Sequence, residues 1–337
     1  MKRKGICYDV GRVMMGMDWR PCFDVKIVQH EIEIIKNDLH CNVVRICGLD
    51  LDRLATAAEL ALQQGLEVWF SPEMWDKSQE DTLEYLVNAA VAAEKLCQQW
   101  PEQLIFSVGS ELTLFMQGIV AGNNLVERLN NPSFWETVKT GTHNQALNAF
   151  LARANAAVRQ VFHGKVVYVS IPLETVDWSL FDFVGVDIYR DQRIRVKYGE
   201  LIKRYFVHNK PVIIGEFGCC TYQGAEDAGG MGWSIIDMSN VPSLLQLNGD
   251  YIRDEGLQAR EITEMLGILD SVGVEGGFVF TFVAPTSPHN ENAKYDLDMA
   301  IYSLVKSFAN KYGITYPDMT WEPKESFSAV AEYYAKH

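Results

Sequence analysis

Two glutamates stand at the ends of apolar runs that lie far apart in the sequence. Glu111 follows the run LIFSVGS and Glu216 lies in KPVIIGEFG. A strand that is buried on both faces is a continuous hydrophobic run, so an ionisable residue at its end has left the core for a rim. Two carboxylates across one cavity can break a glycosidic bond, because one donates a proton while the other attacks or activates water. We therefore expect a sugar-cleaving enzyme.

Eight short apolar runs, each followed by a helix or a helix-sized segment, are the elements that must position these glutamates. The runs are KGICYD, NVVRICG, EVWFSPEMW, LIFSVG, VVYVS, FDFVGVDIY, PVIIGEFG and GGFVFTF. This alternation predicts an α/β fold, a closed (β/α)8 TIM barrel in which residues 1–337 form a single catalytic domain. The alternative is an open doubly wound sheet. It would need a phosphate-binding GxGxxG after an early strand, and KGICYDVGRVMMG lacks that spacing.

Helical periodicity and capping residues predict where the helices lie. One helix is expected to begin behind Asp50 or Asp52 and to stop at Gly65. The others are expected at residues 23–38, 80–99, 144–162, 196–208, 251–272, 294–312 and 325–336. Elaborated rim loops are expected at about 112–141, with one short helix, and at about 217–250, because both segments mix apolar and turn residues.

Composition limits the partners and the compartment. The 337 residues carry a formal net charge of −14, which argues against nucleic acid and against an anionic membrane as partners and suits a neutral carbohydrate. Asp9 and Arg12 interrupt the only N-terminal apolar run, and no later run approaches a membrane span. The seven cysteines are an odd, scattered set that indicates reduced thiols, so we expect a cytoplasmic protein. Nothing in the sequence predicts an oligomeric state.

Other barrel chemistries find little support in the residues. The seven histidines are dispersed, with neither HxH nor HExxH, so no metal and no other cofactor is expected. None of the expected strands ends in the lysine that a Schiff-base aldolase needs. The Gly-rich segment after the seventh strand is acidic at Glu226 and Asp227, which disfavours phosphate binding there.

Four of the runs carry a resemblance to a known group of enzymes. SVGSEL, VGVDIY, PVIIGEFG and GGFVFTF, in that order, resemble strands four, six, seven and eight of the clan A glycoside hydrolases, which are retaining enzymes built on eight-stranded barrels. The resemblance implies that Glu111 is the general acid/base and Glu216 the nucleophile. It also implies that Arg45 supplies a cation, and Tyr189 a hydroxyl, to Glu216.

The sequence departs from the clan at two positions. Ser110 stands where the clan usually has an Asn that holds the sugar 2-hydroxyl. Strand eight ends in Phe280, Thr281 and Phe282 instead of a Trp, so the sugar-stacking ring is expected from Phe282 or from another aromatic residue. The other candidate rings are Trp75, Trp178 and Trp233, of which Trp178 is also placed to pack at a helix start.

Each candidate residue also has a structural interpretation. Arg45 is placed to form an ion pair with Glu73 or Asp9, and Asp187 to orient Arg45 or to bind sugar. Tyr8 and Trp75 are candidates for the site, but they equally fit packing in the upper barrel.

The function also has an alternative. A catalytically inactive barrel that binds carbohydrate or a protein partner, in a defence or sensing pathway, fits the same fold. Retention of both glutamates with supporting residues favours the enzyme, and the two long rim loops favour a walled pocket that takes a small or terminal glycoside.

Overall fold

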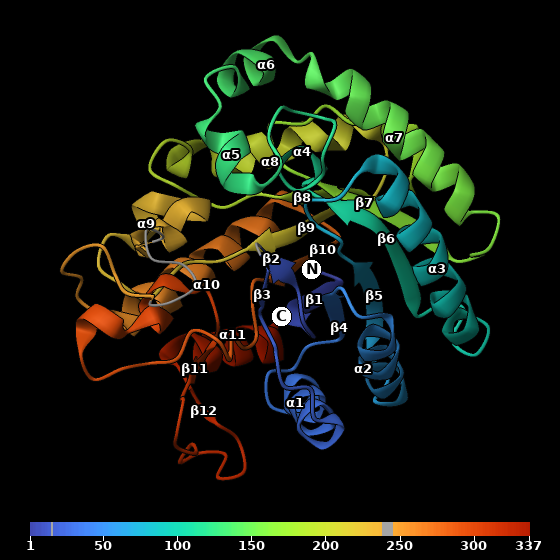
Figure 1. The fold of residues 1–337 in the computed structure, drawn as a ribbon. Helices are drawn as coiled ribbons and strands as arrows, with labels where there is room; N and C mark the ends of the chain where they lie inside the picture. Colours follow the sequence, from blue (N-terminus) through green and yellow to red (C-terminus); the bar gives the residue numbers. More distant parts are fainter. Residues whose placement is uncertain (15, 238–244) are drawn as a thin grey trace.

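The computed structural model describes residues 1–14, 16–237 and 245–337, and its centre is a closed barrel of eight parallel strands (Figure 1). The strands follow one another around the barrel in chain order, and the last pairs with the first, as the (β/α)8 prediction requires. They are β1 (Arg3–Asp9), β4 (Val43–Gly48), β5 (Glu67–Pro72), β6 (Leu104–Ser110), β7 (Lys165–Ser170), β8 (Val184–Asp187), β9 (Val212–Phe217) and β10 (Gly276–Val279).

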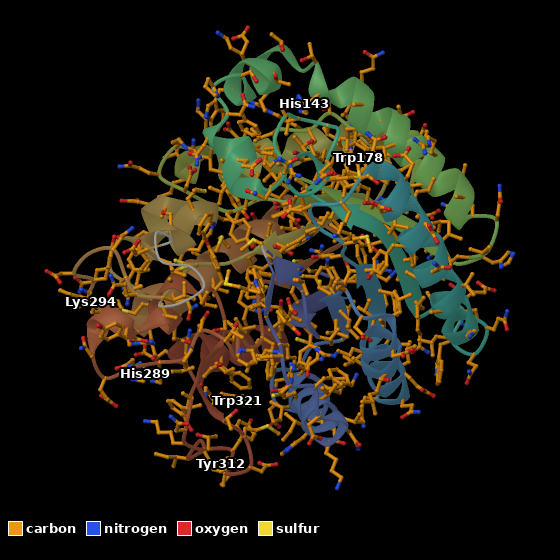
Figure 2. The ribbon with its side chains drawn as sticks, in the orientation of Figure 1. His143, Trp178, His289, Lys294, Tyr312 and Trp321 are labelled. Atoms are coloured by element: carbon orange, nitrogen blue, oxygen red, sulfur yellow. The ribbon has the colours of Figure 1, made fainter. Side chains whose placement is uncertain are left out.

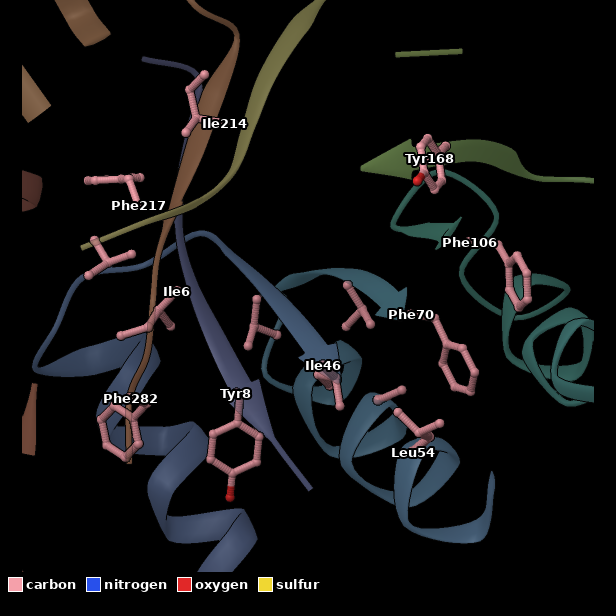
Figure 3. Packing of buried hydrophobic residues seen from close by; sticks show 14 of the residues in the cluster. Ile6, Tyr8, Ile46, Leu54, Phe70, Phe106, Tyr168, Ile214, Phe217 and Phe282 are labelled. Carbon is pink, nitrogen blue, oxygen red and sulfur yellow. The ribbon is translucent and has the colours of Figure 1, made fainter. Parts of the chain in front are cut away.

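Alternate side chains of each strand enter two different cores. One set fills the barrel interior, with Cys7, Val43, Trp69 and Phe278 among its members. The other set faces outward and packs against the surrounding helices, as Figure 3 shows for residues of several strands. This period of two is the reason that a parallel strand must be apolar on both faces.

The main helices begin at side-chain caps that the sequence contains. Asp24, Asp50 and Ser78 each accept hydrogen bonds from backbone N–H groups of the first turn that follows them, so Asp50 and not Asp52 is the cap of the second helix. The helices of the outer layer are α1 (Val25–Asn37), α2 (Leu51–Gln63), α3 (Gln79–Cys97), α7 (His143–Val158), α8 (Tyr198–Lys203), α10 (Glu255–Val272) and α11 (Glu325–Lys336).

The segment after β6 is more helical than the sequence predicts. It holds α4 (Leu112–Phe115), α5 (Leu125–Asn130) and α6 (Phe134–Thr140) where one short helix was expected. The cap of α5 is Asn124, whose side chain accepts from the Glu127 backbone N–H. Helices this short leave little apolar periodicity, which explains why the pattern did not indicate them.

The prediction of a helix at residues 294–312 is wrong. The chain forms the turns η6 (Ala293–Tyr295) and η7 (Leu297–Ala300), then the strand β11 (Val305–Ser307), which pairs with β12 (Trp321–Pro323). Ion pairs of Asp296 and Asp298 with Arg253, and of Asp298 with Lys324, hold this segment in place. Tertiary contacts therefore override the local pattern.

The remaining short elements lie at the rim or between strands. The second rim segment carries α9 (Ala225–Ala228) and η4 (Gly229–Ile235), and the part of it at residues 238–244 lies outside the described residues. A hairpin of β2 (Val13–Met14) and β3 (Met17–Asp18) was not predicted. The other turns are η1 (Trp178–Leu180), η2 (Arg195–Lys197) and η3 (Arg204–His208).

Two further expectations concern the whole chain. All seven cysteines are free, as expected, and Cys219 and Cys220 are buried in an apolar cluster. None of the helices in the described residues has the length and apolar character needed to cross a bilayer.

Gly215 gives the barrel interior room for a charged residue. A Cβ at this position would lie 2.3 Å from Val169 Cγ1 and 2.5 Å from Asp187 Oδ1. We expect Gly215→Ala to lower the free energy of unfolding by about 1–3 kcal/mol, because the core must shift to accept the methyl group. Urea denaturation measures this loss.

Gly267 in α10 is the matched control, because a Cβ there meets nothing within 4 Å. Gly267→Ala should stabilise the protein slightly through its higher helix propensity. Equal stability of Gly215→Ala and the parent protein would contradict the packing account.

Candidate active site

Glu111 lies immediately after β6 in a conformation that few non-glycine residues adopt. Its φ of 51° and ψ of 38° are left-handed, and its backbone N–H donates to the Val169 carbonyl at 2.9 Å. Such a conformation persists only where surrounding contacts fix it, and it is commonest at functional sites. The turn lifts the Glu111 side chain out of the strand, where it keeps part of its surface exposed.

The contacts that fix this turn come from Glu174 and Tyr168. The Glu174 carboxylate accepts from the Thr113 N–H at 3.0 Å and from the Tyr168 hydroxyl at 2.8 Å, and that hydroxyl accepts from the Leu112 N–H at 2.9 Å. Sequence analysis missed Glu174, although a carboxylate just beyond the fifth barrel strand was a usable signal. Glu174 thus anchors the chain on the C-terminal side of Glu111.

Glu216 is in β9, and both expected partners contact it. Arg45 Nη1 donates to Glu216 Oε1 at 3.0 Å, and the Tyr189 hydroxyl donates to Oε2 at 3.0 Å. Arg45 is fully buried and also donates to Glu73 Oε1 at 3.2 Å, so the ion pair expected as an alternative is present as well. One arginine therefore serves two carboxylates.

Arg12 is a site residue that sequence analysis missed. Its Nη2 donates to Glu216 Oε1 at 3.0 Å and to Glu73 Oε1 at 3.1 Å. It comes from the connection between β1 and β2, where a single arginine after a glycine gives little indication of a role. Two guanidinium groups thus share one oxygen of Glu216.

Glu111, Asp187 and Glu216 come together at the carboxyl end of the barrel. One carboxylate oxygen of each lies within 4.8 Å of one from each of the others. The Ser110 hydroxyl donates to Asp187 Oδ2 at 2.7 Å, and Arg45 Nη1 lies 3.7 Å from Asp187 Oδ1. Ser110 therefore holds Asp187, which is itself buried beside the two glutamates.

The surroundings separate the glutamates electrostatically. Burial raises the pKa of Glu111 well above its ordinary value, and the neighbouring carboxylates of Asp187 and Glu216 raise it further. Within the described residues the Glu111 carboxyl accepts no hydrogen bond, whereas Glu216 accepts three. Glu111 is thereby suited to hold a proton. Burial, followed by Glu216, also raises the pKa of Asp187.

The three carboxylates lie close enough to share a divalent cation, but their partners do not fit one. Oxygen ligands of such an ion are normally free of cationic neighbours. Here Glu216 Oε1 accepts from two arginines, and Asp187 accepts from Ser110. The two arginines therefore disfavour a cation beside Glu216.

A row of aromatic rings lines one side of the site. Trp75 stacks on Phe115, with ring centroids 4.3 Å apart, and meets Trp19 edge-on at 5.7 Å. Arg12 lies within 6 Å of the rings of Trp19, Trp75 and Phe280. Trp75, one of the expected candidates, is thus beside the carboxylates, and the ring from strand eight is that of Phe280.

Two expected site residues point away from the carboxylates. The Tyr8 hydroxyl donates to Glu31 of α1, and the Tyr8 ring contacts Phe282, which also packs against Trp321 (Figure 3). Both side chains are fully buried in the outer core. Both side chains face away from the barrel interior. The prediction that Tyr8 and Phe282 belong to the site is therefore wrong.

The two remaining tryptophans differ in their surroundings. Trp178, labelled in Figure 2, is buried. It contacts Phe181 and His208, in agreement with its packing interpretation. Trp233 is partly buried against the cluster around Cys220 and Tyr302, and its contact with sugar stays a prediction.

Comparison with solved structures places this architecture among known enzymes. A GH113 β-1,4-mannanase superposes with a TM-score of 0.57 at 15% identity, covering 99% of both chains. The GH113 β-mannanase from Alicyclobacillus acidocaldarius gives 0.61 at 15% identity, covering 99% of this chain and 97% of its own. The chain has the (β/α)8 fold of these glycoside hydrolases. No protein-family model and no curated protein matched it in sequence.

The same (β/α)8 fold also occurs within larger enzymes. β-Glucuronidase 2 from Bacteroides uniformis superposes with a TM-score of 0.58 at 12% identity over all of this chain, which spans only 35% of that protein. At such low identity the likeness establishes the fold, and the chemistry must be argued from the residues of the site.

The raised pKa of Glu111 predicts a pH-dependent effect of Glu111→Gln on stability. Because the folded pKa lies above the ordinary 4.5, the stability that the protonated carboxyl contributes is complete below about pH 4.5 and is lost as the pH rises through the folded pKa. The amide stays neutral at every pH. The variant should therefore gain stability relative to the parent protein as the pH rises from 4 to 8.

Urea denaturation across this pH range measures the difference. The exposed Glu59 of α2 provides the control, and Glu59→Gln should show no such trend. A Glu111→Gln difference that stays constant or falls with rising pH would contradict the electrostatic description of the site.

Proposed function

We propose that this chain is a retaining glycoside hydrolase that cleaves a small or terminal glycoside by double displacement. The observation that carries the proposal is the approach of Glu111 and Glu216 to within 4.8 Å in unlike surroundings. Retaining enzymes hold their two carboxyl groups about 5–5.5 Å apart, whereas inverting enzymes leave a wider gap for water. The GH113 mannanases of the same fold support this assignment.

In the first step Glu216 attacks the anomeric carbon of the bound sugar. Its Oε2 is the proposed attacking oxygen, because Oε1 is held by Arg12 and Arg45, while Tyr189 is the one donor to Oε2 among the residues that the structure describes. As the new C–O bond forms, the glycosidic C–O bond breaks and the leaving oxygen takes the proton of Glu111. The product is a glycosyl ester of Glu216 and a free alcohol.

In the second step water replaces the enzyme on the sugar. Glu111, now a carboxylate, accepts a proton from water as the water oxygen attacks the anomeric carbon. The ester C–O bond breaks and Glu216 leaves as a carboxylate, which the two arginines stabilise. Glu111 is protonated again, so both residues return to their starting states.

The wall of aromatic rings supports action on a terminal or small glycoside. Trp19, Trp75 and Phe115 come from three different segments and contact one another in a continuous row. We propose that this row closes one end of the substrate site and that its rings contact sugar faces. The free cysteines accord with a cytoplasmic location, and the charge of −14 accords with a carbohydrate partner and not nucleic acid.

Substitution of each glutamate tests the mechanism. With a panel of aryl glycosides, Glu216→Ala and Glu111→Ala should each lose about 10²-fold or more in kcat, since each removes a group that acts in the transition state. Azide should rescue Glu216→Ala and give a glycosyl azide of inverted configuration, which proton NMR identifies. Glu59→Ala is the matched control and should keep full activity.

The outcome separates the proposal from its alternative. A protein that binds a sugar and cleaves none would be the inactive carbohydrate-binding barrel. Inverted configuration in the product of the parent protein would contradict the retaining mechanism.

Action on chain ends is tested with oligosaccharides labelled at the reducing end. If the aromatic row closes one end of the site as proposed, single sugar units are released first, as chromatography over time would show. Early products of mixed length would contradict the terminal-unit proposal.

A further inference from the structure

Arg12 contacts the proposed nucleophile Glu216 from the connection between β1 and β2. We propose that Arg12 is a positioning residue, which holds the attacking carboxylate of Glu216 ionised and correctly oriented. The inference rests on the proposed function, because it assigns a purpose to a contact with its nucleophile. Arg12 lies between β1 and β3, in a segment whose hairpin the sequence did not predict.

The backbone before Arg12 is built to aim this side chain inward. Asp9 Oδ1 accepts from the N–H groups of Gly11 at 2.7 Å and Arg12 at 2.9 Å, which closes a tight turn. Gly11 has a φ of +128°, and a Cβ there would lie 2.9 Å from Arg53 Nη1. Only glycine satisfies both the conformation and the space.

The guanidinium of Arg12 joins Glu216 to Glu73. Its Nη2 donates to Glu216 Oε1 at 3.0 Å, and its Nε forms an ion pair with Glu73 Oε2 at 2.6 Å. Arg45 contacts the same two carboxylates. The planar fork of arginine can satisfy both partners at once, whereas the single ammonium of lysine cannot hold this geometry.

The position of Arg12 makes its charge effective. The residue is 3% exposed, and its Cζ lies 5.3 Å from the Phe280 ring centroid, 5.7 Å from that of Trp75 and 5.9 Å from that of Trp19. Rings on several sides keep water from the guanidinium, and a charge pair shielded from water interacts more strongly than one at the surface.

Several charged or titratable groups face Glu216 in addition to Arg12. They come from five different parts of the barrel mouth and are Cys7, Arg45, Glu73, Glu111, Asp187 and Tyr189. Of these, Arg45 is the only other cation. Loss of Arg12 would therefore leave Glu216 with one cationic partner beside the carboxyl groups of Glu73, Glu111 and Asp187.

Arg12→Gln, Arg12→Lys and Arg20→Gln form the test set. Arg20 is the matched control, because it lies shortly after β3, is similarly buried and pairs with Glu31 on the outer side of the barrel. The dependence of kcat/KM on pH is measured for each. In Arg12→Gln the rising, acidic side of the kcat/KM profile, its acid limb, should move about 1 pH unit or more to higher pH. The reason is that a positive charge has been removed from beside the Glu216 carboxylate.

Arg12→Lys should keep the acid limb nearer to that of the parent protein but lose about 10-fold or more in kcat, because charge is retained and orientation is not. Arg20→Gln should lower stability and leave the acid limb in place. An acid limb in Arg12→Gln that matches that of Arg20→Gln would overturn the proposal, since Arg12 would then act only through folding. If Arg12→Gln does not fold, an unaltered kcat in Arg12→Lys overturns it.

A measurement without turnover separates this inference from the proposed function. Carbon-13 NMR of protein labelled at glutamate carboxyls follows the titration of Glu216, assigned by its absence in Glu216→Gln. The midpoint should rise in Arg12→Gln whether or not any glycoside is cleaved. Absence of turnover in the parent protein would refute the proposed function, and an unmoved midpoint would refute the role of Arg12.

Discussion

The proposed chemistry depends on two neighbouring carboxyl groups that lie in unlike surroundings. Glu111 and Glu216 approach within 4.8 Å in a site that is largely withdrawn from water. Like charges at this distance oppose each other, so one group retains a proton unless cations neutralise both. Arg12, Arg45 and Tyr189 all contact Glu216, and among the described residues none of them bonds to Glu111. This asymmetry supports the proposal that Glu111 is the acid and Glu216 the nucleophile.

The barrel supplies the asymmetry through its own geometry. Parallel strands deliver their carboxyl ends to one rim, which brings β6 and β9 to a common mouth. The left-handed turn at Glu111 releases that side chain from the strand direction, while Glu216 stays in the strand and remains beside Arg45. Gly215 leaves space for Asp187, which contacts Arg45 and Ser110 from the interior. The fold thus fixes one carboxylate by its strand and the other by a strained turn.

Hydrophobic periodicity and the positions of strand ends predicted much of the fold from the sequence. All eight barrel strands and most of the outer helices follow from those patterns, whereas the pairing of Glu216 with Arg45 and Tyr189 was implied by the resemblance to the clan A glycoside hydrolases. Tyr8 was misplaced because neighbouring residues of a strand face opposite sides, so an error of one position moves a side chain from the site into the core. Phe282 lies beyond the end of β10, where strand alternation does not predict its direction, and it also packs in the outer core.

Long-range contacts account for the remaining differences. Arg12 and Glu174 acquire their roles from partners that are distant in the sequence, and no local pattern predicts such partners. The segment around Asp296 departs from its helical pattern because Arg253 binds its side chain. The substitution of Ser for Asn at position 110 is explained only in three dimensions, where the Ser110 hydroxyl meets Asp187.

The most direct test of the central claim is to trap the covalent intermediate. The protein is incubated with a panel of 2-deoxy-2-fluoroglycosyl fluorides, and the modified residue is located by peptide mass spectrometry. The account predicts one attached sugar, carried by Glu216 and absent from Glu216→Ala. A label on Glu111 or Asp187, or hydrolysis of a glycoside by the parent protein with no label on Glu216, would contradict it.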